Sequence, residues 1–476
     1  MSEVGMEYSL KGILRELLSY KSGIASIVIL ALLIGLSVYT VVTIPPQKAI
    51  AMWRGENNMW IENPRNAAPE WMAFFVHKNL PKTFKVASWE KSFGIVKAEA
   101  PLPGTSIKKI HIEMSFNYPY DDFPSEVNIF FRAKFNASKN TPLVKIYWIK
   151  PDGTRIPVTE MTMRDPNQIL YVSVDQQIYN NLVMWLQKEK GITPYKTVTT
   201  QQILFGKITP AMAQGKVDVE KGAYKLVVDA TTYNKGDDVD LKLVVYGTVY
   251  GIAGTDHLRR PLIIALLWGT PVAIAFGLTA SLAISIIQLF IATISGWYAG
   301  IIDSIIQRIT EIYMIIPFLP FLIMMAAFYK LDIWTILAVV IVLSIFGAGI
   351  KSTRALVMQI KEYPYVEAAK AYGASDARII TFYIIPKILP PLVPGLIGSV
   401  PGFVFLEAAL SLLGLGDPYL PTWGKIINDA YNNGALYKGY YYWILEPSFM
   451  LIVTALAFAM LGFALDKIVN PRLREM

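Results

Sequence analysis

Six stretches of the chain are runs of apolar residues, each close to the length that crosses a lipid bilayer as a helix. About 20 residues suffice for such a helix, and the first run, at 23–44, contains no charged residue. The other runs cover 270–298, 304–329, 334–350, 388–413 and 444–465. The pattern predicts a polytopic α-helical membrane protein with six spans.

Ahead of the first run, apolar residues recur at helical spacing. They fall on one face, which predicts an amphipathic helix along the membrane surface: Leu10, Ile13, Leu14, Leu17 and Leu18. A cleaved signal peptide is the alternative for the run at 23–44. Its apolar part would be too long, and no small-x-small cleavage site precedes Ile44. We therefore expect residues 1–44 to form a surface helix and a retained first span.

Basic residues in the short loops give the expected orientation. The N-terminus, the loop at 351–387 and the C-terminal tail each carry several lysines or arginines. All three lie on one side if there are six spans. Both termini are then cytoplasmic in a plasma membrane protein, and the region from about 45 to 260 lies outside. Its basic balance does not conflict with this, because long domains escape the positive-inside rule.

The long region between the first two runs, residues 45–253, is predicted to be a mainly β extracellular domain. Seven segments show alternation or β-branched and aromatic enrichment: 109–117, 126–135, 144–150, 154–158, 169–174, 224–231 and 239–249. Residues 176–190 favour a helix ended by Gly191. We expect a β-sandwich-like domain, and we hypothesise that it docks a binding protein. Asn136-Ala137-Ser138 is a glycosylation sequon, although many such triplets have no function.

The amino-acid composition argues against several kinds of metal, catalytic and nucleic-acid site. The 476-residue chain has a net charge of +8, 54% hydrophobic residues and no cysteine, so disulfides, zinc–cysteine sites and iron–sulfur clusters are excluded. The three histidines are scattered, a pattern that favours neither a histidine metal site nor a Ser-His-Asp centre. Basic residues are not interleaved with aromatics in the manner of a nucleic-acid site, so we expect no nucleic-acid partner.

The polar loop between the fourth and fifth runs contains a compact helical pattern. Helix-favouring residues occupy 367–371, and Gly373 favours a stop. Ser375 or Asp376 can cap a second helix that ends before Pro386. Alanines keep the first helix slim, so another protein could approach it closely. The alternative is an ordinary helix-turn-helix between two spans, and physical reasoning on the loop alone favours that alternative.

This loop resembles the EAA motif of ABC importer permeases, in Glu367-Ala368-Ala369, Gly373 and Pro386. Three further stretches resemble the C-type permease subunit of dipeptide/oligopeptide importers. They are Gly254-Thr255-Asp256, Glu407–Gly416 with Pro421-Thr422-Trp423-Gly424, and Leu461-Gly462 with the tail at 466–474. The likeness covers about residues 1–75 and 250–476. One departure is Arg259-Arg260-Pro261, where the family's GTD-x-x-GRD pattern ends in Gly-Arg-Asp.

The resemblance implies a type I ABC importer transmembrane fold, with a permease core at 254–476. It also implies coupling to an ATPase groove through the loop at 351–387. The residues carried over to that role are Glu367, Ala368, Ala369, Lys370, Gly373, Ala374 and Pro386. The implied partners are a second permease subunit, two ATP-binding cassette subunits, an extracellular substrate-binding protein and membrane lipid. The chain lacks G-x-x-x-x-G-K-[ST], so we expect ATP and Mg to be bound by partner subunits and no cofactor here.

The fifth run is rich in proline and glycine, which predicts a broken helix at the pathway or a subunit interface. Candidate residues of the translocation path are Phe318, Met324, Met325, Pro394, Phe403 and Glu407. A charge such as Glu407 is expensive at membrane depth, but a buried structural hydrogen bond explains it equally well. Ordinary packing is the alternative for the others. Arg308 and Glu311 are expected to pair with each other.

The preferred interpretation is a non-enzymatic permease subunit of a di- or oligopeptide importer. Oligosaccharide import by the same machinery stays open. A membrane-anchored extracellular receptor or adhesion protein is the alternative of another class, against which six spans and the EAA loop argue. A membrane enzyme would need a nucleophile–base pair or a metal cluster, for which the sequence offers no pattern.

Overall fold

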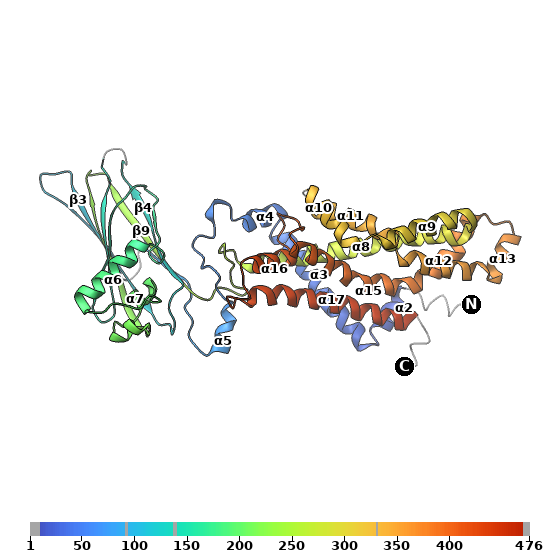
Figure 1. The fold of residues 1–476 in the computed structure, drawn as a ribbon, viewed down its shortest axis with the longest axis horizontal. Helices are drawn as coiled ribbons and strands as arrows, with labels where there is room; N and C mark the ends of the chain where they lie inside the picture. The colour runs from blue at the N-terminus through green and yellow to red at the C-terminus, as the bar shows by residue number, and fades with distance from the viewer. Residues whose placement is uncertain (1–9, 91–93, 137–139, 330–331, 470–476) are drawn as a thin grey trace. The chain divides into compact units, whose positions relative to one another are not determined.

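The computed structural model describes residues 10–90, 94–136, 140–329 and 332–469 (Figure 1). The chain divides into two compact units, unit 1 (Met1–Glu56 and Leu262–Met476) and unit 2 (Asn57–Pro261). These boundaries lie 12 and 8 residues beyond the sequence-based ones at 44 and 253. Ala137 and Ser138 of the sequon and the tail from Asn470 lie outside the described residues.

Unit 1 is helical. Its elements are α2 (Leu10–Leu17), α3 (Lys21–Thr43), α4 (Pro46–Arg54), α8 (Leu262–Tyr298), α9 (Gly300–Ile315), α10 (Phe318–Phe328), α11 (Ile333–Ile345), α12 (Ala348–Lys361), α13 (Pro364–Ala371), α14 (Asp376–Ile379), the π segment η4 (Ile380–Ile384), α15 (Ile385–Leu412), α16 (Trp423–Asn432) and α17 (Tyr442–Val469). The first, second and sixth predicted spans correspond to α3, α8 and α17.

The third and fourth predicted spans are bent pairs of helices, not single straight helices. α9 meets α10 at 76°, and α11 meets α12 at 48°. Pro317 lies at the first break and Gly347 at the second, and both residue types weaken a continuous helix. Four described helices are long and apolar enough to cross a membrane alone, or six if each bent pair is one span. The six-span count therefore stays a prediction.

The fifth predicted span is a continuous helix, which corrects the expected break. α14, η4 and α15 together form one helix, Asp376–Leu412, so the loop's second helix does not end before Pro386. Proline cannot donate to the carbonyl four residues back, and its ring crowds that carbonyl. The wider π turn just ahead of Pro386 accommodates it. The helix continues past four more prolines, at 390, 391, 394 and 401.

Close packing of α8 organises unit 1. A Cβ atom on Gly277 would come within 2.7 Å of the Val404 side chain of α15. One on Gly296 would come within 2.8 Å of Val357 of α12. Glycine therefore lets these helices approach more closely than any larger residue would allow. α15 also packs along α17, and α17 along α3.

Unit 2 contains two antiparallel sheets, as predicted for a sandwich. One has the order β1 (Phe84–Ala87), β9 (Asp238–Tyr246), β4 (Glu126–Lys134), β7 (Ile169–Leu170). The other has the order β2 (Ile95–Pro101), β3 (Lys108–Tyr118), β8 (Gly222–Thr232), β5 (Leu143–Ile149), β6 (Arg155–Thr162). Alternate side chains of both sheets enter one core. The predicted helix, α6 (Gln176–Lys190), ends at Gly191 as expected, and Asp175 caps its start.

Other elements of unit 2 are short. They are η1 (Glu56–Asn58), which straddles the unit boundary, η2 (Glu70–Met72), α5 (Ala73–Val76), α7 (Thr200–Phe205) and η3 (Pro210–Gln214). The sequence analysis did not predict β1 and β2. Both are edge strands, and β2 is mostly exposed. An edge strand needs no regular apolar face, so its pattern is weak.

A backbone-bonded stem lies where unit 2 enters and leaves; we define it as residues 63–70 and 248–261. The Ala68 N–H donates to the Thr248 carbonyl at 2.9 Å, and the Tyr250 N–H donates to the Ala68 carbonyl at 2.8 Å. The Thr255 hydroxyl donates to the Pro64 carbonyl at 2.8 Å. Arg260 donates to the buried Asp256 carboxylate at 2.5 Å. The stretch that resembles the family's GTD motif is therefore structural here.

A buried lysine holds the end of β5 to the loop before β8. The Lys150 side chain is 0% exposed, and its ammonium lies 2.9 Å from the Glu220 carboxylate. It also donates to the Gly206 carbonyl. Burial lowers the pKa of Lys150, and Glu220 opposes that shift by favouring the charged form.

We predict that Lys150→Met destabilises unit 2. The substitution leaves the Glu220 carboxylate and the Gly206 carbonyl without the ammonium group that they contact, at a site where water has little access. Breaking one side of a buried pair costs about 3 kcal/mol. The matched control is Lys145→Met, whose exposed pair with Glu160 at 3.2 Å contributes less than about 1 kcal/mol. Urea unfolding of the purified full chain measures both, and equal losses would contradict the buried pair's role.

Candidate coupling site

The predicted helix of the EAA loop is α13. It begins with Pro364 in its first turn and ends just before Gly373, whose φ of +77° lies in the left-handed region that favours glycine. The Gly373 N–H donates to the Lys370 carbonyl at 2.9 Å, and the Ala374 N–H donates to the Ala369 carbonyl at 3.1 Å. These bonds satisfy carbonyls at the helix end. The predicted stop at Gly373 is confirmed.

One face of α13 is buried within this chain. Val366 and Ala369 belong to an apolar cluster with Trp297 of α8 and Val357 of α12. Ala374 packs against the same cluster. The sequence analysis expected Ala369 to set how closely a partner packs, and the structure corrects this because Ala369 points inward.

The opposite face of α13 is open. Glu367, Ala368 and Lys370 are exposed, as is Gly373. The neighbouring Tyr372 is 92% exposed. A carboxylate beside a small alanine and a free aromatic ring forms a surface of mixed polarity that another protein can contact.

Two lysines hold the end of α8 beneath this helix. The ammonium of Lys361 donates to the Trp297 carbonyl at 2.8 Å, at a helix end where cations are favourable. The ammonium of Lys370 lies 4.7 Å from the centroid of the Trp297 ring, within reach of a cation–π contact. Sequence reasoning missed Lys361 and Trp297, because the two lie 64 residues apart and no local pattern joins them.

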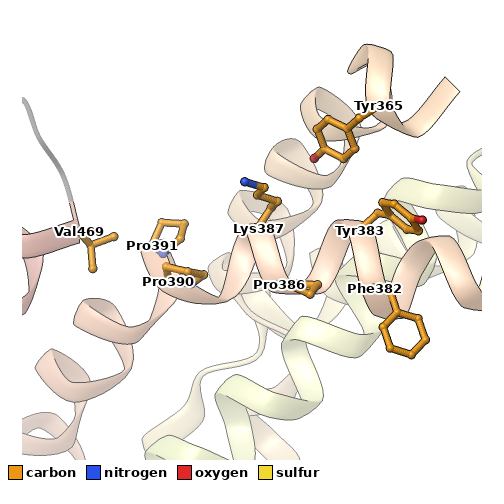
Figure 2. A pocket seen from close by; sticks show the side chains of 8 residues that line it. All are labelled: Tyr365, Phe382, Tyr383, Pro386, Lys387, Pro390, Pro391 and Val469. Atoms are coloured by element: carbon orange, nitrogen blue, oxygen red, sulfur yellow. The ribbon is translucent and has the colours of Figure 1, made fainter. Parts of the chain in front are cut away.

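A groove of about 650 Å³ adjoins α13 (Figure 2). It is lined by Tyr365 of α13, residues of η4 and α15, and the end of α17: Phe382, Tyr383, Pro386, Lys387, Pro390, Pro391 and Val469. The exposed Pro386, carried over by the resemblance, lies on this wall. The groove and the open face of α13 together form the candidate coupling site.

The predicted path residues are not brought together in one open site. Phe318 and Phe403 pack against the same apolar cluster around Phe276, Met325 is half-buried and Met324 is exposed. Pro394 is buried. Glu407 is 3% exposed and accepts a hydrogen bond from the Ser411 hydroxyl at 2.8 Å. Pro394 and Glu407 are therefore buried within this chain, and the hydrogen bond of Glu407 agrees with the structural alternative; a role on the translocation path stays a prediction.

Residues of two other sequence patterns, the Pro-Thr-Trp-Gly stretch and the Arg308–Glu311 pair, form hydrogen bonds or ion pairs within the chain. Thr422 caps α16, and the Trp423 indole N–H donates to the Leu266 carbonyl at 2.9 Å. Arg308 pairs with Glu311 at 3.3 Å, as predicted, and Lys351 shares that carboxylate at 3.4 Å.

The part of the chain that the structure describes therefore combines helices long and apolar enough to cross a membrane with a short helix, α13, that has one buried face and one exposed face. Residues 288–475 match the family described as binding-protein-dependent transport system inner membrane component.

Similar proteins agree with that match. The dipeptide transport system permease protein DppC of Bacillus subtilis (strain 168) is 31% identical over 223 residues, 47% of this chain and 69% of the relative. The oligopeptide permease OppC of the same organism is 29% identical over 224 residues, 47% of this chain and 72% of the relative. The glutathione permease GsiD of Pectobacterium atrosepticum is 28% identical over 223 residues, 47% of this chain and 73% of the relative.

Among solved structures, the inward-facing MetNI methionine ABC transporter matches at a TM-score of 0.33 with 21% identity. The match covers 44% of this chain and 97% of that chain. The assignment therefore rests on the sequence relatives. The chain belongs to the family of binding-protein-dependent ABC importer permeases. It is a multi-pass membrane protein and a non-catalytic transport subunit.

We predict different effects for neighbouring alanines of α13. Ala369→Leu forces extra atoms into a packed cluster, which costs about 1–3 kcal/mol, and displaces α13. Ala368→Leu adds the same atoms to an exposed position and changes stability by less than about 0.5 kcal/mol. Thermal unfolding and limited proteolysis of the purified chain measure these effects. Equal destabilisation by both variants would contradict the assigned faces of α13.

Proposed function

We propose that the chain is a permease subunit of an ATP-driven importer of di- and oligopeptides, forming half of the translocation pathway. The support is the set of relatives named as dipeptide, oligopeptide and glutathione permeases. Oligosaccharide import by the same machinery is the second candidate for the cargo, because a permease of this kind receives its cargo from a separate binding protein.

The proposed topology has six spans, with α9–α10 and α11–α12 each counted as one bent span. Both termini and the loop at 351–387 lie in the cytoplasm, and residues from about 45 to 260 lie outside. The clustering of lysine and arginine in the short segments supports this orientation.

The open face of α13 carries the proposal for coupling. Glu367 and Ala368 dock in a groove of the partner ATPase, with Lys370 and Gly373 at the edge of the contact. Ala369 and Ala374 support the helix from within, and Pro386 lines the adjoining groove. ATP and Mg are bound by the partner subunits, since this chain has no Walker A sequence. Closure of the ATPases moves α13, and the bundle follows.

The proposed assembly contains this chain, a homologous second permease, two ATPase subunits and an external binding protein. Purification through a tag on this chain tests the assembly. Recovery of two ATPases and a second permease supports it. Recovery of the chain alone would instead fit a membrane-anchored receptor.

We predict that Glu367→Ala weakens association with the ATPase and uncouples ATP hydrolysis from uptake. A hydrogen bond to a charged group contributes about 1.5–3 kcal/mol, which corresponds to about ten- to hundredfold in affinity. The measurement is ATPase retention on the purified chain, together with uptake in proteoliposomes.

The matched control is Glu189→Ala, which removes an exposed helical carboxylate from α6 in unit 2. It should leave ATPase retention unchanged. Full retention by the Glu367 variant would show that α13 does not meet the ATPase through this carboxylate.

We predict that the binding protein that copurifies with the assembly takes peptides. Calorimetric titration with a mixture of di- and oligopeptides should show saturable heat, and an oligosaccharide mixture should show none. Saturation by oligosaccharides alone would move the assembly to the second candidate cargo while leaving the coupling mechanism intact.

A further inference from the structure

An exposed apolar patch stands beside the stem of unit 2. We call it the aromatic patch, and it consists of Trp71, Phe74, Phe75, Val76 and Ile252. Phe74 is 80% exposed, Phe75 76% and Ile252 75%. Exposed apolar side chains gathered in one place mark interaction surfaces.

The patch is held in a fixed arrangement. The Trp71 indole N–H donates to the Ile252 carbonyl at 2.9 Å, which joins two segments 181 residues apart. The Trp71 and Phe75 rings meet edge to face with centroids 6.0 Å apart. The Glu70 N–H donates to the Gly251 carbonyl at 2.8 Å. The exposed rings therefore belong to an ordered surface fastened to the stem.

The stem limits how far the patch can lie from the membrane. Ile252 precedes Leu262, the first residue of α8, by ten positions, and the predicted second span begins eight residues further on, at 270. Ten extended residues reach at most about 35 Å, and eight helical residues add about 12 Å. The actual reach is shorter, because the Asp256 N–H donates to the Arg260 carbonyl at 3.1 Å and turns the chain back on itself.

The chemistry of the patch matches a lipid surface. Tryptophan favours the interface between headgroups and acyl chains, and Phe and Val add apolar depth. The exposed Lys78 follows directly and suits anionic headgroups. Leu258, four residues before α8, is also more than half exposed.

We infer that the aromatic patch inserts into the headgroup region of the membrane that α8 spans. The occupant is the bilayer of this chain's own membrane. The proposed outside placement of residues 45–260 determines which leaflet of the bilayer the patch meets. The contact with lipid itself does not rest on that placement.

The natural absence of cysteine allows a site-directed test in the full chain. Phe75→Cys and, separately, Phe74→Cys carry a nitroxide label, and both side chains are exposed enough to be replaced without repacking a core. The control is Leu102→Cys, an exposed position in the turn before β3. Leu102 lies near the Lys108 end of β3. The Tyr118 end of the same strand leads to Pro119, whose carbonyl accepts a hydrogen bond from Asn79, shortly after α5. The 11 residues of β3 separate its two ends by about 33 Å.

The chain is placed in nanodiscs of phosphatidylcholine with phosphatidylglycerol, and label accessibility to oxygen and to a water-soluble nickel chelate is measured. Labels at 74 and 75 should favour oxygen severalfold over the nickel chelate, and the label at 102 the reverse. Water accessibility at 74 and 75 equal to that at 102 would overturn the inference. So would low accessibility of both labels to both reagents, which indicates contact with protein.

Sidedness is measured separately from lipid contact. A membrane-impermeant thiol reagent applied to right-side-out vesicles should modify Leu102→Cys. Modification only after the vesicles are opened would overturn the proposed outside placement of unit 2. The oxygen preference at position 75 would still decide whether the patch contacts lipid.

Discussion

Unit 1 depends on close approach of neighbouring helices to the backbone of α8. Lipid tails are as apolar as leucine, so association within the membrane relies on tight packing rather than on escape from water. Three glycines provide it. A Cβ on Gly269 would meet the Trp423 ring at 2.2 Å, and a Cβ on Gly277 or Gly296 would come within 2.7 or 2.8 Å of a valine of α15 or α12. α8 therefore positions α16, α15 and α12, and α12 leads into α13.

This arrangement gives α13 a mechanical connection to the bundle. Its buried face, Val366 and Ala369, packs on Trp297 near the end of α8, and the same cluster includes Ile384 at the end of η4 and Ile388 in the first turn of α15. A packed cluster of this kind resists deformation. In the proposed mechanism, a displacement of α13 by an ATPase would therefore move α8 and α15 together. Two residues of this cluster, Trp297 and Ile388, lie outside the sequence motif.

Much of the architecture follows from local pattern, and the remainder depends on contacts between distant residues. The apolar runs locate α3, α8 and α17 because burial in lipid needs length and apolarity alone. α6 follows from periodicity and its closing glycine. The inward orientation of Ala369 and the burial of Glu407 could not be predicted, because each depends on which neighbours pack there. The π turn before Pro386 could not be predicted either, because the proline by itself favours a break, whereas tertiary packing stabilises a continuous helix.

The stem explains the chain's departure from its family pattern. The family's GTD-x-x-GRD pattern has glycine where this chain has Arg259, and Arg259 adopts a φ of +67°. That conformation costs a non-glycine residue about 1–2 kcal/mol. The guanidinium donates to the Asn63 carbonyl at 2.6 Å and to the Glu126 carboxylate of β4, and it lies 4.6 Å from the centroid of the Tyr246 ring. These contacts offset the strain, and all three partners belong to the inserted unit 2. Arg259 therefore ties the end of unit 2 to Asn63, to β4 and to β9.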